Sequence, residues 1–227
     1  MKRDRRQRTL EFRTWGGKRK NAGRKAPSGK RPGVSHHGRG AHKAAHPVHV
    51  TLRLRREIPS VRERSLYIAV ENAIRAGNDR AGFRAVEFSV RGNHLHFIVE
   101  AADARALTSG MQGLTIRIAR AINRALKRTG KVFADRFHHR ELSTPTETRN
   151  ALEYVFLNVH HHAKHHGLRW NPRLVDPYSS ATWFTGWATP IETIRRAAPP
   201  PVALAQTWML RVGWRRLGLL RPSKKSA

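Results

Sequence analysis

Two histidines in the middle of the chain have the spacing of a paired metal ligand. His94 and His96 lie two residues apart within an apolar run, and alternate side chains of a β-strand project from the same face. Two imidazoles on one face can share one divalent ion. Such a pair is equally consistent with polar residues on the solvent face of a half-buried strand, so the motif is weak by itself.

A tyrosine and an amide further along the chain strengthen this interpretation. Tyr154 and Asn158 are four residues apart, which places them on one face of a helix, one turn from each other. Phenols have a pKa of about 10 and are poor nucleophiles at neutral pH without a base or a cation nearby. A metal held by His94 and His96 could polarise a phosphate for attack by the Tyr154 hydroxyl. The alternative is an amphipathic helix on which this hydroxyl only reaches water.

The excess of basic residues predicts a polyanionic partner. The chain has 45 Lys and Arg against 15 Asp and Glu, a formal net charge of +30, and an isoelectric point near 11.9. Nucleic acid is the usual partner of such a protein. No apolar run approaches a membrane span or a secretory core, so we expect a cytoplasmic, nucleoid-associated protein that does not bind membranes. The absence of cysteine excludes disulfides, thiolate metal sites and cysteine nucleophiles.

The pattern of apolar residues predicts the strands and helices that carry these side chains. Alternation predicts strands over 48–55, 85–90, 95–99 and 131–142, the second and third joined by a hairpin turn. Helical spacing predicts helices over 66–76, 107–130 and 145–164. This order is typical of an α+β, ferredoxin-like antiparallel sheet with two helices on one face, plus a tyrosine-bearing helix.

Composition divides the chain into three regions. Residues 1–46 are rich in Lys, Arg, Gly and Pro and cannot bury enough apolar surface to stay ordered, so we expect a disordered basic arm. Residues 47–167 are expected to form the catalytic domain. Residues 168–227 are expected to form a basic C-terminal extension with a short apolar helix over 202–210.

Four segments, taken in order, resemble the HUH-type single-tyrosine transposases, in particular the REP-associated tyrosine transposases of the insertion-sequence-200-like family. The segments are HPVHVTLR at 46–53, GNHLHF at 92–97, TGKVFADRF at 129–137 and LEYVFLN at 152–158. Four segments in this order are far more specific than any one of them. The resemblance covers 47–167 and does not extend to the rest of the chain.

The resemblance implies an enzyme that cleaves and rejoins single-stranded DNA through a 5′-phosphotyrosine intermediate. It makes Tyr154 the nucleophile, His94 and His96 the metal ligands, and Asn158 the position of a third, amide ligand. It also implies Mg²⁺ or Mn²⁺ as cofactor and hairpin DNA as partner, and it allows a homodimer. The chain departs from the family after Asn158 with a histidine-rich run at 160–166. This run could chelate a metal, but we interpret it as a chiefly neutral polar patch near DNA.

Five arginines on or beside the predicted strands are candidates for phosphate contacts. Each of them alone is more often a solvated surface charge, but as a group they favour a nucleic-acid interface near the tyrosine. They are Arg53, Arg55, Arg91, Arg136 and Arg140.

Three other functions compete with the transposase hypothesis. A non-catalytic, domesticated DNA- or RNA-binding protein would keep the fold and charge, but it gives no reason to retain two histidines and a tyrosine together. A nuclease that uses several carboxylates would need an acidic cluster, and only Glu87 and Asp135 are candidates for one. A ribosomal-type RNA binder explains the charge alone. Covalent trapping on DNA separates these classes.

Overall fold

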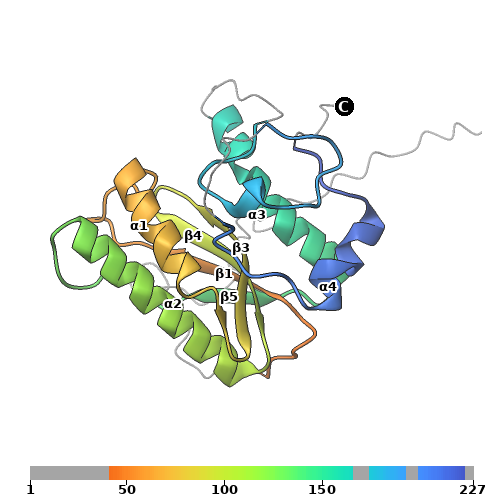
Figure 1. The fold of residues 1–227 in the computed structure, drawn as a ribbon, viewed down its shortest axis with the longest axis horizontal. Helices are drawn as coiled ribbons and strands as arrows, with labels where there is room; N and C mark the ends of the chain where they lie inside the picture. The colour runs from red at the N-terminus through yellow and green to blue at the C-terminus, as the bar shows by residue number, and fades with distance from the viewer. Residues whose placement is uncertain (1–40, 166–173, 193–198, 223–227) are drawn as a thin grey trace, which may run out of the picture. The chain divides into compact units, whose positions relative to one another are not determined.

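A five-stranded antiparallel sheet forms the centre of the fold, in the strand order β2-β3-β4-β1-β5 (Figure 1). A computed structural model describes residues 41–165, 174–192 and 199–222, the side chains of 158–165 excepted. The basic arm predicted over 1–46 therefore lies almost wholly outside the described residues. The strands are β1 (Val48–Arg53), β2 (Asp79–Arg80), β3 (Phe83–Val90), β4 (His94–Ala101) and β5 (His138–Glu141).

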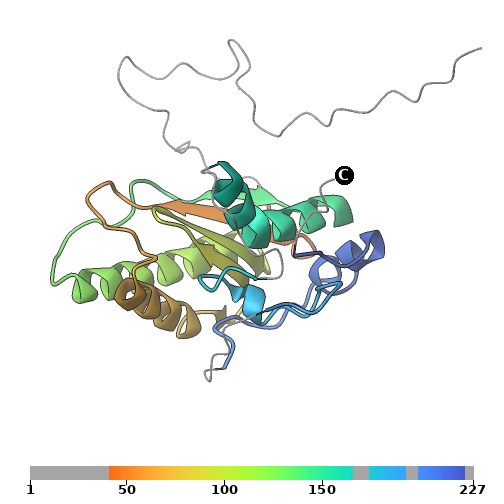
Figure 2. The same cartoon turned by 90° about the horizontal axis from the view of Figure 1, so that it is seen from above.

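Helices cover both faces of this sheet. The helices α1 (Arg64–Arg75) and α2 (Ala104–Ala125) lie side by side on one face, and α3 (Pro145–His165) lies on the other (Figure 2). The short elements η1 (Ser180–Thr182), α4 (Trp208–Arg211) and η2 (Gly213–Leu217) follow on the α3 side. The α+β, ferredoxin-like plan predicted from the sequence is confirmed. None of the helices in the described ranges is long and apolar enough to cross a bilayer.

Strand alternation decides which residues face each layer. On β1, Val48, Val50 and Leu52 are buried in the core beneath α1 and α2, so His49 and Thr51 face α3. On β4, Leu95, Phe97 and Val99 join the same core. The even-numbered residues of β4 therefore face α3, where Ile98 packs into a second core with Val155 and Phe156.

The second core fixes the orientation of α3. Leu152, Val155 and Phe156 of this helix are buried, and the fully buried Trp214 from η2 packs in the same cluster. Burial of aromatic and aliphatic side chains on one helical face sets which residues remain outside it. Tyr154 lies at the border of that face and is 46% exposed.

Three predicted elements are shorter than expected. The strand predicted over 131–142 is regular only in β5, because Val132 and Phe137 enter the core singly from an irregular loop. The helix predicted to reach Gly130 ends at Ala125 in a Schellman motif, in which Arg128 N donates to Asn123 O and Lys127 has a positive φ of 49°. Of the helix predicted over 202–210 only α4 is helical, and Thr207 caps its N-terminus.

A buried carboxyl joins β3 to η1. Glu87 follows an irregularity in the β3–β4 register, and its Oε2 lies 2.6 Å from Ser180 Oγ. Ser180 Oγ also accepts from Phe88 N at 2.9 Å. Burial raises the pKa of Glu87 from 4.5 to about 8, and the hydrogen bond to Ser180 opposes this rise only in part. Glu87 is therefore protonated at neutral pH.

The Glu87 carboxyl should make the fold less stable in alkali. The folded chain holds this proton more tightly than the unfolded chain, so its contribution is complete below pH 4.5 and is lost as the pH rises through about 8. Urea unfolding at pH 5 and pH 9 should show a loss on the order of a few kcal/mol that Glu87→Gln abolishes. The exposed Glu63→Gln is the control, and an equal pH response in wild type and Glu87→Gln would refute the assignment.

Two glycines of α2 should respond oppositely to alanine. A Cβ at Gly110 would lie 2.2 Å from Phe83 Cγ and 2.7 Å from Phe83 Cβ, whereas a Cβ at Gly113 meets nothing within 4 Å. We expect Gly110→Ala to destabilise the fold by about 1–3 kcal/mol through overpacking. Gly113→Ala should stabilise it by up to about 1 kcal/mol through helix propensity. Thermal unfolding measures both, and equal effects would show that Phe83 does not constrain α2.

Candidate active site

Three aromatic rings from three elements meet on the α3 side of the sheet. The ring of Tyr154 on α3 lies 5.2 Å from that of His96 on β4 and 5.5 Å from that of His49 on β1, edge-on in both cases. The two imidazoles stack at 5.6 Å. The tyrosine and one of the two predicted ligand histidines are therefore in direct contact, although 58 residues separate Tyr154 and His96 in the sequence (154 − 96).

His94 extends this cluster along β4. Its ring lies 6.3 Å from that of His96 in a nearly parallel arrangement, as expected for alternate residues of one strand. Its Nδ1 is 2.7 Å from Asn93 Oδ1. Partial burial lowers the pKa of His94, and the charge of Arg53, its cross-strand partner, lowers it further. Both effects favour the neutral imidazole, the form that binds metals.

Thr51 orients the His96 ring. These residues are directly opposite in the β1–β4 pair, and Thr51 Oγ1 lies 3.2 Å from His96 Nδ1. The tautomer decides which of the two atoms donates, but either arrangement occupies Nδ1. A metal would then be bound through Nε2, with Thr51 as the partner that fixes the ring.

His49 belongs to the cluster but was missed by sequence reasoning. Its Nε2 is buried and has no hydrogen-bond partner within the described residues. Burial lowers its pKa to about 4, and the charge of Arg140, its cross-strand partner, acts in the same direction. Strand alternation placed His49 on the same face as Thr51. The position of His49 beside His96 follows only from the β1–β4 register, which cannot be predicted from the sequence.

Arg91, one of the predicted DNA contacts, is buried beside the turn of α3 that carries Tyr154. Its Nη1 donates to Asp176 Oδ2 at 3.1 Å and its Nη2 to the carbonyl of Val155 at 3.4 Å. Asp176 is wholly buried and also receives two bonds of 2.9 Å from Arg62. Desolvation lowers the pKa of Arg91, and the nearby Asp176 and Tyr154 oppose this effect. Sequence reasoning gave no sign of Asp176.

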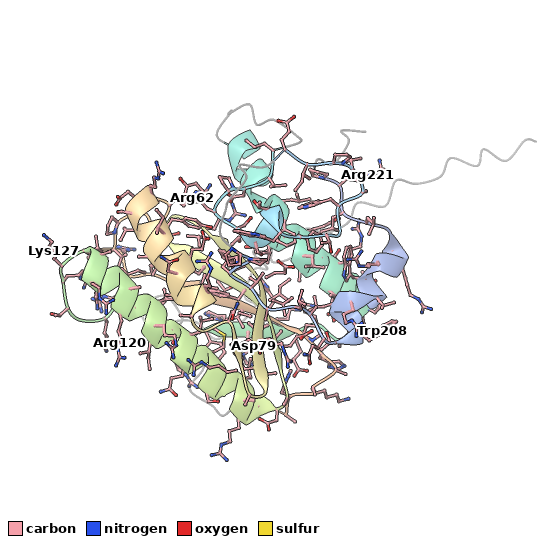
Figure 3. The ribbon with its side chains drawn as sticks, viewed as in Figure 1. Arg62, Asp79, Arg120, Lys127, Trp208 and Arg221 are labelled. Carbon is pink, nitrogen blue, oxygen red and sulfur yellow. The ribbon has the colours of Figure 1, made fainter. Side chains whose placement is uncertain are left out.

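The other four predicted arginines are divided between two regions. Arg53 and Arg140 flank the ring cluster through their pairing with His94 and His49, and Arg140 also binds Glu147 at 2.6 Å. Arg55 follows the end of β1 and forms an ion pair with Glu57. Arg136 lines a hollow of about 300 Å³ with residues of α2. The basic residues Arg120 and Lys127 also belong to the α2 side of the sheet (Figure 3).

His94 and His96 are candidate metal ligands, but the described side chains show no complete metal site. No group of three or more His, Asp or Glu side chains in these ranges has the arrangement of a metal site. Asn158, the predicted third ligand, and the run 160–166 lie outside the described side chains. Glu87 is bonded to Ser180, and the exposed Asp135 accepts from Arg136 N. Neither acid joins a carboxylate cluster.

The comparisons with known proteins give a distant structural likeness and no sequence match. No protein-family model matches the chain, and no curated protein is found to match it. A solved structure described as a REP-associated tyrosine transposase bound to a REP hairpin is 18% identical in sequence, with a TM-score of 0.49. The likeness covers 66% of this chain and 84% of that one. A likeness of this extent establishes neither a family nor an activity.

The Thr51 hydroxyl should matter for metal affinity if His94 and His96 share an ion. Thr51→Val keeps the side-chain shape but removes the bond to His96 Nδ1. We expect Mn²⁺ binding, followed by the loss of the free-ion electron paramagnetic resonance signal, to weaken about 10- to 100-fold. Thr115→Val, on α2 across the sheet, is the matched control. Unchanged affinity in Thr51→Val would exclude this role of the hydroxyl.

Proposed function

We propose that this protein cleaves and rejoins single-stranded DNA, with Tyr154 as the nucleophile. The observation that carries the proposal is the half-exposed Tyr154 ring against His96, one of two neighbouring imidazoles on the same face of the sheet. A phenol beside a pair of candidate metal ligands, on a chain of net charge +30, has the chemistry to attack a phosphodiester. The motif resemblance to single-tyrosine transposases favours the same reaction.

The proposed reaction exchanges one phosphodiester for another. Tyr154 Oη forms a bond to phosphorus while the bond from phosphorus to the 3′-oxygen breaks. The phenol loses its proton to solvent, and the departing 3′-oxygen takes one up. The products are a 5′-phosphotyrosine link and a free 3′-hydroxyl, which can reverse the reaction by attacking the link. No nucleotide cofactor is required, because one phosphate ester replaces another.

His94 and His96 would hold the divalent ion, with Asn158 as the expected amide ligand. Two same-face imidazoles, one oriented by Thr51 and the other beside Asn93, fit such a pair of ligands. Mg²⁺ or Mn²⁺ would supply Lewis-acid polarisation of the scissile phosphate. Arg53 and Arg140 are suited to bind the flanking phosphates of single-stranded or hairpin DNA. A nucleoid-associated location and a homodimer are further parts of the proposal.

Covalent trapping of DNA tests the proposal. Wild-type protein, incubated with labelled single-stranded hairpin DNA and Mg²⁺ or Mn²⁺, should give a protein–DNA adduct on a denaturing gel. Tyr154→Phe should abolish the adduct, and His94→Ala should reduce its rate at least about 100-fold by analogy with the loss of other electrostatic stabilisers. Tyr178→Phe and His139→Ala are the matched controls and should retain it.

Two outcomes would contradict the proposal. An adduct that persists in Tyr154→Phe would mean that another nucleophile reacts. Tight DNA binding without any adduct, over a varied pool of DNA and both ions, would favour the non-catalytic binding protein instead.

A further inference from the structure

We propose that Arg91, held by Asp176, is a positioning residue. It fixes the turn of α3 that carries Tyr154 over β4, the strand of His94 and His96. The inference rests on the proposed function for its catalytic consequence, though its geometry does not depend on that function. It assigns a role in the site to the segment after α3, which the sequence indicated only as a basic extension.

Arg91 is bonded to both halves of the site. Its backbone N donates to the carbonyl of His94 at 2.7 Å, which closes the β3–β4 hairpin at the first predicted ligand. Its Nη2 donates to the carbonyl of Val155, the residue after Tyr154. A helical carbonyl has a second lone pair for such a bond beyond its bond within the helix. One residue thus links β4 to the turn of α3 that carries Tyr154, through its backbone N on one side and its buried guanidinium on the other.

Asp176 determines where the Arg91 guanidinium can lie. Its carboxylate is fully buried and accepts from Arg91, twice from Arg62, and from Tyr178 N at 3.1 Å. Arg62 lies just before α1 (Figure 3). Its Nη1 also donates to the carbonyl of Val90 at 2.9 Å. The guanidinium of Arg91 is buried and that of Arg62 is partly buried, and two such cations repel each other without an anion between them. Asp176 is therefore the group that allows Arg91 to stay beside α3.

Loss of this carboxylate should displace the tyrosine rather than unfold the protein. Without Asp176, the Arg91 guanidinium would move toward water and lose its bond to Val155. A displacement of about 1 Å at a reacting atom can slow a reaction by about 100-fold. DNA binding would be affected little, because Asp176 and Arg91 are buried and the proposed phosphate contacts, Arg53 and Arg140, are on other strands.

A kinetic comparison of four variants tests this role in the full chain. Asp176→Asn should slow adduct formation on saturating hairpin DNA by about 100-fold, with DNA affinity unchanged. If Asp176 acts through Arg91, the double variant Arg91→Met, Asp176→Asn should be no slower than Arg91→Met alone. Glu71→Gln breaks a buried ion pair with Arg75 on α1, on the opposite face, and should leave the rate unchanged.

A spectroscopic measurement separates positioning from the proposed reaction. The chain has three tyrosines, so 3-fluorotyrosine labelling gives three ¹⁹F resonances, and Tyr154→Phe assigns one of them. Asp176→Asn should shift or split the Tyr154 resonance, and Glu71→Gln should not. This change, in a protein that never forms an adduct, would support the positioning role while the proposed function fails. A wild-type rate in Asp176→Asn, multiplicative effects in the double variant, or an unmoved Tyr154 resonance would overturn the positioning role.

Discussion

The register between β1 and β4 is the constraint on which the site depends. It places Thr51 opposite His96 and Arg53 opposite His94, while Leu52 and Leu95 pair on the other face. A slip of one residue would turn the histidines into the core beneath α1 and α2 and expose the leucines and Phe97. The apolar layer thus holds the imidazoles in place without touching them. Backbone bonds from Leu54 to Asn93 and from Val61 to Gly92 hold the same alignment at the hairpin.

The part of the site that could be predicted is the part determined by short-range periodicity. His94 and His96 share a face because of the strand repeat, and Tyr154 follows from the helical repeat of its neighbours, both of which are local. Thr51 and His96 are 45 residues apart, and Arg91 and Asp176 are 85 residues apart. Pairing over such separations depends on sheet register and loop path. The composition of the segment after 167 indicates only that it is basic. It does not indicate that Asp176, one of the few acids there, binds both Arg62 and Arg91.

The scarce carboxylates of this basic chain serve as internal ties. Glu100, on the same face of β4 as the histidines, accepts backbone bonds from Gln206 and Thr207. Glu141 on β5 binds His42 and His46. Glu147, in the first turn of α3, binds Arg140 and accepts from Ser143 N just before the helix. Glu100 and Glu141 join distant parts of the chain, Glu147 joins β5 to the start of α3, and in each case a partner offsets the desolvation of the carboxylate. Among the described residues no cluster of carboxylates forms a metal centre, whereas the two imidazoles carry no charge that repels DNA.

The late position of Trp214 in the sequence affects the order in which the two cores of the nascent chain can form. The core beneath α1 and α2 has all of its buried residues once β5 has emerged, because they lie between 48 and 137. The face that carries the ring cluster needs Val175, Leu210, Trp214 and Leu220 to fill its core. During vectorial synthesis the histidines and the tyrosine are therefore made well before their supporting layer. A nascent chain that already contains every proposed reactive group would remain unassembled until synthesis had continued from Tyr154 to Trp214.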